Sequence, residues 1–135
     1  MGAKKILIID DEKAICQLVK DGLERMGDFE VIMALSGLIG IELAKKIRPD
    51  LILLDIGMPR MSGFEVIRKL KEDNDTITIP VVMLSGRGDE EAKIESMELY
   101  DEDYITKPIA LTDLKVKIES VLKRRVPDKT GWGKV

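Results

Sequence analysis

The sequence predicts an α/β protein built on a doubly wound, five-stranded parallel sheet with five helices. Five short apolar segments alternate with five segments whose apolar residues recur every three or four positions, which is the alternation expected of repeated βα units. The short segments are apolar throughout, as expected for strands covered by helices on both faces. With 135 residues, 44% of them hydrophobic, the chain is long enough for one domain with a substantial core.

The first two βα units have the clearest boundaries. Residues 4–9 (KKILII) predict the first strand, and the three- and four-residue spacing of apolar side chains predicts a helix over residues 12–26. The second strand is predicted at residues 30–34. A helix over residues 36–46 follows it, because Ser36 is a favourable N-cap and the Arg-Pro pair after the helix ends it.

The other three βα units repeat the pattern, with glycine and proline residues marking the strand boundaries. Gly and Pro interrupt the chain after the third strand, and a proline precedes the fourth. The strands are predicted at residues 51–54, 81–84 and 103–106, and the helices from about residue 62, over 89–97 and over 111–122.

Composition excludes several classes of site. The chain has no histidine, so His-based catalysis and His-ligated zinc are excluded. Its one cysteine, Cys16, lies in a helical pattern and is interpreted as a buried structural thiol. No apolar run approaches the roughly 18 residues of a membrane helix and no signal peptide opens the chain, so we expect a soluble, cytoplasmic protein.

Charge is distributed unevenly along the chain. The net charge is −3, but residues 123–135 carry +4 and the remainder −7. An acidic domain with a short basic tail is a poor candidate for direct nucleic-acid binding.

Reactive side chains follow four of the five predicted strands. Asp10 and Asp11 follow the first strand, Asp55 the third, Ser85 the fourth and Lys107 the fifth. The carboxyl ends of parallel strands meet at one edge of a sheet, where such folds bind their ligands. We therefore expect three carboxylates, a hydroxyl and an ammonium to converge there.

Three neighbouring carboxylates repel one another unless a cation bridges them. A set of oxygen ligands without His or Cys favours Mg²⁺, with Mn²⁺ as the alternative. Such an ion would also let Asp55 act as a nucleophile toward a phosphoryl group, with Lys107 and Ser85 contacting phosphoryl oxygens and the Gly57 carbonyl facing the metal.

Four segments, "ILIIDDE", "PDLILLDIGMPRMSGFEVI", "VVMLSGRGD" and "DEDYITKPI", occur in this order. Together they resemble the receiver domain of two-component response regulators over residue 4 to about residue 123. The resemblance implies a flavodoxin-like sheet with strand order 2-1-3-4-5. It also implies a receiver domain at residues 1–123, followed by a basic tail or the start of a linker at residues 124–135.

The resemblance also implies a role for each site residue. Asp55 corresponds to the phosphoacceptor, and Lys107 to the lysine of the site. The metal ligands correspond to Asp10, Asp11, Asp55 and the Gly57 carbonyl, and the switch residues to Ser85 and Tyr104. The peptide bond between Lys107 and Pro108 is expected to be cis.

The implied function is a phosphorylation-activated signalling switch. The implied partners are a sensor histidine kinase or phosphotransfer protein, a downstream output domain or protein, and a second copy of the chain. The output face would be the fourth helix, fifth strand and fifth helix. Such a protein catalyses its own phosphorylation and dephosphorylation and is not a conventional enzyme.

Three other functions are weighed against this one. A phosphorylation-independent interaction module would not need the full set of site residues. An aspartate-nucleophile phosphatase would need a second acid two residues after the nucleophile, where the chain has Gly57. A nucleotide-binding module would need a glycine-rich phosphate loop, and neither common pattern occurs.

Overall fold

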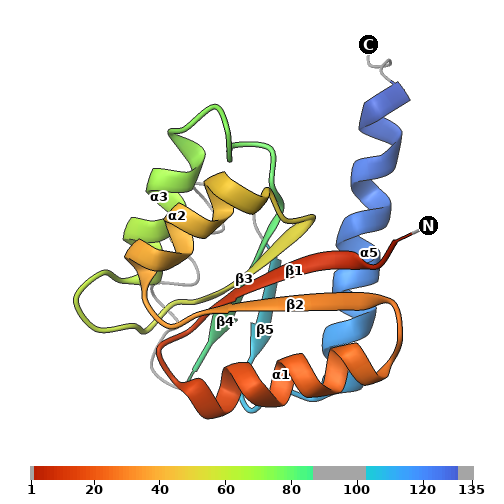
Figure 1. Ribbon diagram of the computed structural model, residues 1–135, viewed down its shortest axis with the longest axis horizontal. Coiled ribbons are helices and arrows are strands. Elements are labelled where there is room, and N and C mark those ends of the chain that lie inside the picture. The colour runs from red at the N-terminus through yellow and green to blue at the C-terminus, as the bar shows by residue number, and fades with distance from the viewer. Residues whose placement is uncertain (1, 87–102, 131–135) are drawn as a thin grey trace.

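The computed structural model describes residues 2–86 and 103–130. Within them, five parallel strands form one sheet in the order β2-β1-β3-β4-β5 (Figure 1). This confirms the predicted fold class and strand order. The strands are β1 (Lys4–Ile9), β2 (Phe29–Ala34), β3 (Leu51–Asp55), β4 (Val81–Ser85) and β5 (Asp103–Thr106).

Helices cover both faces of the sheet, as the continuously apolar strands predicted. One face carries α2 and α3 and the other carries α1 and α5 (Figure 1). The helices are α1 (Lys13–Arg25), α2 (Gly37–Ile47), α3 (Gly63–Lys71) and α5 (Leu111–Thr130). The helix predicted over residues 89–97 lies outside the described residues.

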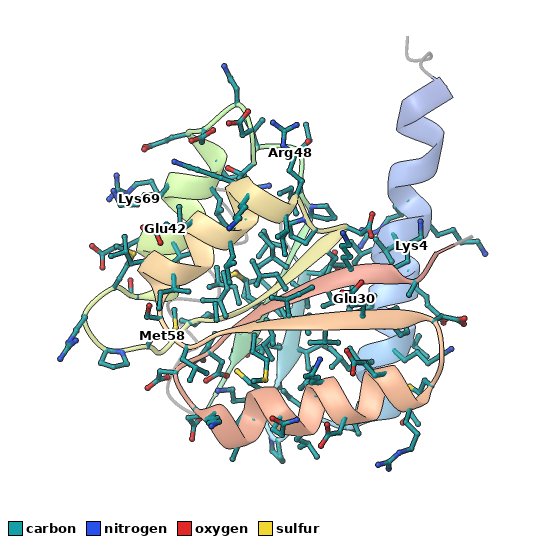
Figure 2. All side chains as sticks on the ribbon, in the orientation of Figure 1. Lys4, Glu30, Glu42, Arg48, Met58 and Lys69 are labelled. Carbon is teal, nitrogen blue, oxygen red and sulfur yellow. The ribbon has the colours of Figure 1, made fainter. Side chains whose placement is uncertain are left out.

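The core consists of two apolar layers, one on each face of the sheet. Alternate residues of a strand point to opposite faces, so Leu7 and Ile9 pack toward α2 and α3 while Ile6 and Ile8 pack toward α1 and α5. Cys16 is fully buried in the second layer, as predicted. Figure 2 shows side chains filling both layers, with Lys4 and Met58 toward opposite ends of the sheet.

Local signals in the sequence explain two helix starts and one helix end. The Ser36 hydroxyl accepts a hydrogen bond from the Ile39 N–H at 3.2 Å, as predicted for the N-cap of α2. At α3, Ser62 and Glu65 form a capping box. Helix α2 ends at Arg48, which adopts a left-handed conformation (φ 48°).

The predicted end of the last helix is wrong. The apolar pattern stops at Leu122, but α5 continues to Thr130 and projects past the sheet (Figure 1). The end of an apolar stripe is not the end of a helix: Lys123, Arg124 and Arg125 directly after Leu122 have high helix propensity, although Pro127 further on disfavours continuation. Among the described residues, no helix is both long and apolar enough to span a membrane.

Candidate functional site

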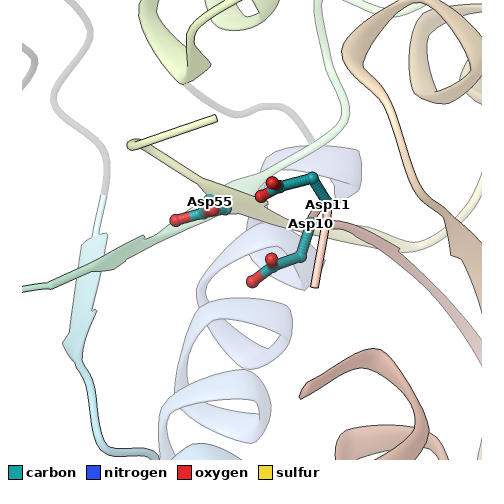
Figure 3. A group of neighbouring side chains, drawn as sticks. All are labelled: Asp10, Asp11 and Asp55. Atoms are coloured by element: carbon teal, nitrogen blue, oxygen red, sulfur yellow. The ribbon is translucent and has the colours of Figure 1, made fainter. Parts of the chain in front are cut away.

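Three carboxylates meet at the carboxyl edge of the sheet. Asp10 and Asp11 follow β1, and Asp55 ends the neighbouring β3 (Figure 3). One oxygen from each lies within 4.8 Å of the others. Asp10 is fully buried, Asp55 is 4% exposed and Asp11 is exposed. The predicted convergence of these three residues is therefore confirmed.

The backbone around Asp55 holds its side chain in place. The Gly57 N–H donates to Asp55 Oδ1 at 3.3 Å, and the Ile56 N–H donates to the Leu84 carbonyl at 3.1 Å. The Gly63 N–H, at the start of α3, donates to the Ile56 carbonyl at 3.0 Å. The loop after β3 is thus tied both to β4 and to α3, directly beside the carboxylate.

Lys107 brings a positive charge to the same place. It follows β5, and its backbone N–H donates to the Ser85 carbonyl at 2.7 Å. Its Nζ lies 3.1 Å from Asp10 Oδ2 and 3.2 Å from Asp55 Oδ1. The Lys107–Pro108 peptide bond is cis, as predicted.

Burial and charge act together on the ionisation of this group. Burial raises the pKa of Asp10 above its ordinary value of 3.8, and the charge of Asp55 raises it further, against the opposing effects of the Glu12 N–H and Lys107. Burial alone would lower the pKa of Lys107, but the charges of Asp10 and Asp55 outweigh burial and raise it. Lys107 is therefore a permanent cation, and the two buried carboxylates share it.

The residues fit a divalent hard cation. Asp10 Oδ2 is the one fully buried side-chain oxygen in the described part of the chain without a hydrogen bond, since its pairing with Lys107 lacks hydrogen-bond geometry. One oxygen from each of the three carboxylates lies within 4.8 Å of the others, so a single ion between them is within reach of all three. Because Asp11 is exposed, its side chain can supply the remaining adjustment.

Ser85 and Tyr104 lie on the two strands beyond Asp55. Ser85 ends β4 and is 2% exposed, one residue past Leu84, which pairs with Asp55. Tyr104 on β5 is half-buried and packs against the core layer beneath α2 and α3. Both predicted switch residues are therefore on the strands next to the site.

Glu12 contacts the site without having been predicted to do so. Its Oε1 lies 3.4 Å from Lys107 Nζ. The available signal was its position directly after the acidic pair. The contact joins residues 95 positions apart, which no local pattern can indicate.

The sequence matches a known protein family over most of its length. A family model described as "Response regulator receiver domain" matches residues 6–119. The chain belongs to the response regulator receiver domain family. Its predicted place in two-component signalling is therefore confirmed.

Individual relatives agree with the receiver assignment. The chain is 39% identical to the DNA-binding dual master transcriptional regulator RpaA of Synechocystis, over 91% of this chain and 52% of that protein. It is also 39% identical to the phosphate regulon transcriptional regulatory protein PhoB of Pseudomonas aeruginosa, over 94% of this chain and 55% of that protein. The receiver thus spans about half the length of these relatives, which are regulators and not conventional enzymes.

Solved structures show the same fold. The chemotaxis protein CheY4 of Vibrio cholerae superimposes with a TM-score of 0.81 at 29% identity, covering 89% of this chain and 99% of that chain. A response regulator receiver domain protein from Clostridium thermocellum superimposes with a TM-score of 0.82 at 33% identity, covering 90% and 96%.

Proposed function

We propose that this receiver is a phosphorylation-activated switch whose phosphoacceptor is Asp55. The observation that carries the proposal is the pairing of a nearly buried carboxylate with Lys107 at 3.2 Å, beside two further carboxylates. A buried carboxylate with one shared cation is costly to maintain for stability alone. Its position at the carboxyl edge of the sheet, where such folds bind ligands, favours a chemical role.

The metal site we propose consists of Asp10, Asp11, Asp55 and the Gly57 backbone carbonyl, with Mg²⁺ as the ion and Mn²⁺ as a substitute. When bound, Mg²⁺ would offset the negative charge of the phosphoryl oxygens and of the carboxylates. Asp10 Oδ2, buried and without a hydrogen bond, is the oxygen with most to gain from such a ligand.

In the proposed transfer, an Asp55 oxygen forms a bond to phosphorus while the phosphorus–nitrogen bond of a donor phosphohistidine breaks. The histidine retains the bonding electron pair and takes up a proton. Lys107 is already beside Asp55 and would pair with a phosphoryl oxygen of the aspartyl phosphate. The Ser85 hydroxyl would donate a hydrogen bond to another phosphoryl oxygen. Hydrolysis of the aspartyl phosphate resets the switch.

We propose that the phosphoryl group is read through Ser85 and Tyr104. Movement of Ser85 toward the phosphoryl group would let Tyr104 turn inward and change the output face, which is made by the helix predicted over residues 89–97, β5 and α5. On this face, Asp103 of β5 forms ion pairs with Arg124 and, at 3.7 Å, with Lys117 of α5. These pairs couple the position of β5 to that of α5.

The partners follow from the proposed chemistry. A sensor histidine kinase or phosphotransfer protein supplies the phosphoryl group in the cytoplasm, and an output domain or protein reads the output face. We place a homodimer contact on the same face. Nucleic-acid binding is assigned to the output partner, because the chain before the basic tail, residues 1–122, has a net charge of −7.

Mass spectrometry tests the proposed function. The chain is incubated with Mg²⁺ and a small phosphodonor, such as phosphoramidate, and weighed intact. We expect one phosphoryl group per wild-type chain, none on Asp55→Asn and a wild-type level on Asp113→Asn, which removes an exposed carboxylate of α5. Chelation of Mg²⁺ should abolish uptake.

The same experiment separates the other functions. An unmodified wild-type chain would favour a phosphorylation-independent interaction module. Catalytic turnover of phosphate esters would favour the phosphatase, against which stands Gly57 in the position of a second acid.

A further inference from the structure

Glu12 has a conformation that its place in helix α1 does not explain. It is the N-cap residue of α1, yet its side chain makes no capping hydrogen bond. Glutamate is also not among the residues preferred at this position. Its backbone N–H donates to Asp10 Oδ1 at 2.9 Å, and its carboxylate extends instead toward Lys107.

Lys107 Nζ is consequently surrounded by three carboxylates, Asp10 at 3.1 Å, Asp55 at 3.2 Å and Glu12 at 3.4 Å. Asp10 and Asp55 are buried, whereas the Glu12 side chain is 61% exposed. Lys107 donates hydrogen bonds to Asp55 and Glu12, and its pairing with Asp10 rests on charge without a hydrogen bond. Glu12 therefore occupies the solvent side of Lys107, from which a phosphodonor would approach.

We propose that Glu12 is a positioning residue that holds the Lys107 ammonium and competes with the incoming phosphoryl group for it. This inference rests on the proposed function. The phosphoryl oxygens need a proton of Lys107, and the one directed to solvent is engaged by Glu12. The Glu12 charge also opposes the approach of an anionic donor. Glu12 thereby lowers the rate at which Asp55 is phosphorylated by small donors.

Glu12→Gln should raise that rate. The substitution keeps the side-chain length and removes the charge. We expect the second-order rate constant with acetyl phosphate to rise about three- to tenfold at low ionic strength, the range of one unit charge acting near a protein surface. The gain should be smaller with phosphoramidate, which carries less negative charge.

Two further variants identify the origin of the effect. Glu12→Asp keeps the charge but is one methylene shorter, so its carboxylate no longer reaches Lys107; it should phosphorylate faster than the wild type but more slowly than Glu12→Gln, because the repulsion of the donor remains. Glu30→Gln removes an exposed charge from β2 (Figure 2) and should phosphorylate at the wild-type rate. The proposal is overturned if Glu12→Gln does not exceed the wild-type rate, or if Glu12→Asp matches the wild type while Glu12→Gln is faster.

A second measurement does not depend on phosphorylation. In carbon-13 NMR spectra of the Mg²⁺-loaded chain, the Lys107 Cε signal should shift in Glu12→Gln and Glu12→Asp and stay unchanged in Glu30→Gln. An unchanged signal in all three variants would overturn the contact. If the wild type takes up no phosphate from any donor, the proposed function fails, and the NMR shift still decides whether Glu12 holds Lys107.

Discussion

Replacing Gly63 with alanine tests how the start of α3 positions the phosphoacceptor loop. A Cβ at residue 63 would lie 2.5 Å from the Asp55 carbonyl oxygen and 2.7 Å from Ile56 Cα. Both atoms belong to backbone, so neither can rotate away. The loop would have to move, and the Gly63 N–H to Ile56 carbonyl hydrogen bond at 3.0 Å would lengthen or break.

The expected cost follows from these contacts. Overpacking costs about 1–3 kcal/mol and a lost hydrogen bond about 1 kcal/mol. The helix propensity of alanine returns up to about 1 kcal/mol. Gly63→Ala should therefore reduce the free energy of unfolding by about 1–3 kcal/mol, which lowers the urea midpoint by roughly 0.5–1.5 M at an m-value of about 2 kcal/mol/M.

Gly22→Ala is the matched control within α1. The atoms nearest to its Cβ are the two methyl groups and Cγ of the half-buried Leu111 side chain, which is flexible and can rotate, unlike backbone. We expect its free energy of unfolding to stay within about 1 kcal/mol of the wild type, because the helix gains propensity. The reasoning is refuted if Gly63→Ala and Gly22→Ala unfold at the same urea concentration, or if Gly63→Ala takes up phosphate at the wild-type rate.

Three more predictions concern sites away from the loop. Thr76→Val removes the buried hydroxyl that donates to the Leu70 carbonyl at 2.7 Å. The substitution should reduce the free energy of unfolding, measured in urea, by about 1–3 kcal/mol. An unchanged free energy of unfolding would contradict a stabilising role for this hydrogen bond. The Lys20 hydrogen bond and then the Val31 N–H lower the pKa of Glu24, so its contribution to stability is fully present above the ordinary value of 4.5 and is lost as pH falls through the lower folded pKa. Unfolding measured across this range should depend less on pH in Glu24→Gln, and an unchanged pH profile would refute the linkage. Burial, followed by the charge of Asp10, raises the pKa of Cys16 to about 12. A thiol reagent should therefore label Cys16 in the native chain only as fast as the chain unfolds. Immediate labelling of Cys16 would contradict this prediction.

The fold was predictable because its strands are buried on both faces. Segments such as residues 51–54 are apolar throughout, and the alternation with helical patterns leaves few sheet topologies. Convergence of Asp10, Asp11 and Asp55 followed from the same fact, since each comes after a parallel strand. The resemblance supplied the strand order and the cis bond before Pro108.

Other features depend on information that apolar periodicity does not contain. Helix α5 extends past Leu122, where the apolar pattern ends, because helix propensity in Lys123, Arg124 and Arg125 does not appear in that pattern. The Thr76 hydroxyl is buried where it donates a hydrogen bond to the Leu70 carbonyl in helix α3. The Glu12 side chain contacts Lys107, which lies 95 positions later in the sequence. Such contacts are decided by tertiary packing.

The central claim is that Asp55 is the residue that carries the phosphoryl group. Borohydride reduces an acyl phosphate to the alcohol with release of phosphate, so a phosphorylated aspartate becomes homoserine. Peptide mapping by mass spectrometry after this treatment should find homoserine at position 55 alone, and only in chains incubated with both Mg²⁺ and phosphodonor. Homoserine at another position, or none in a chain that has gained a phosphoryl group, would contradict the account.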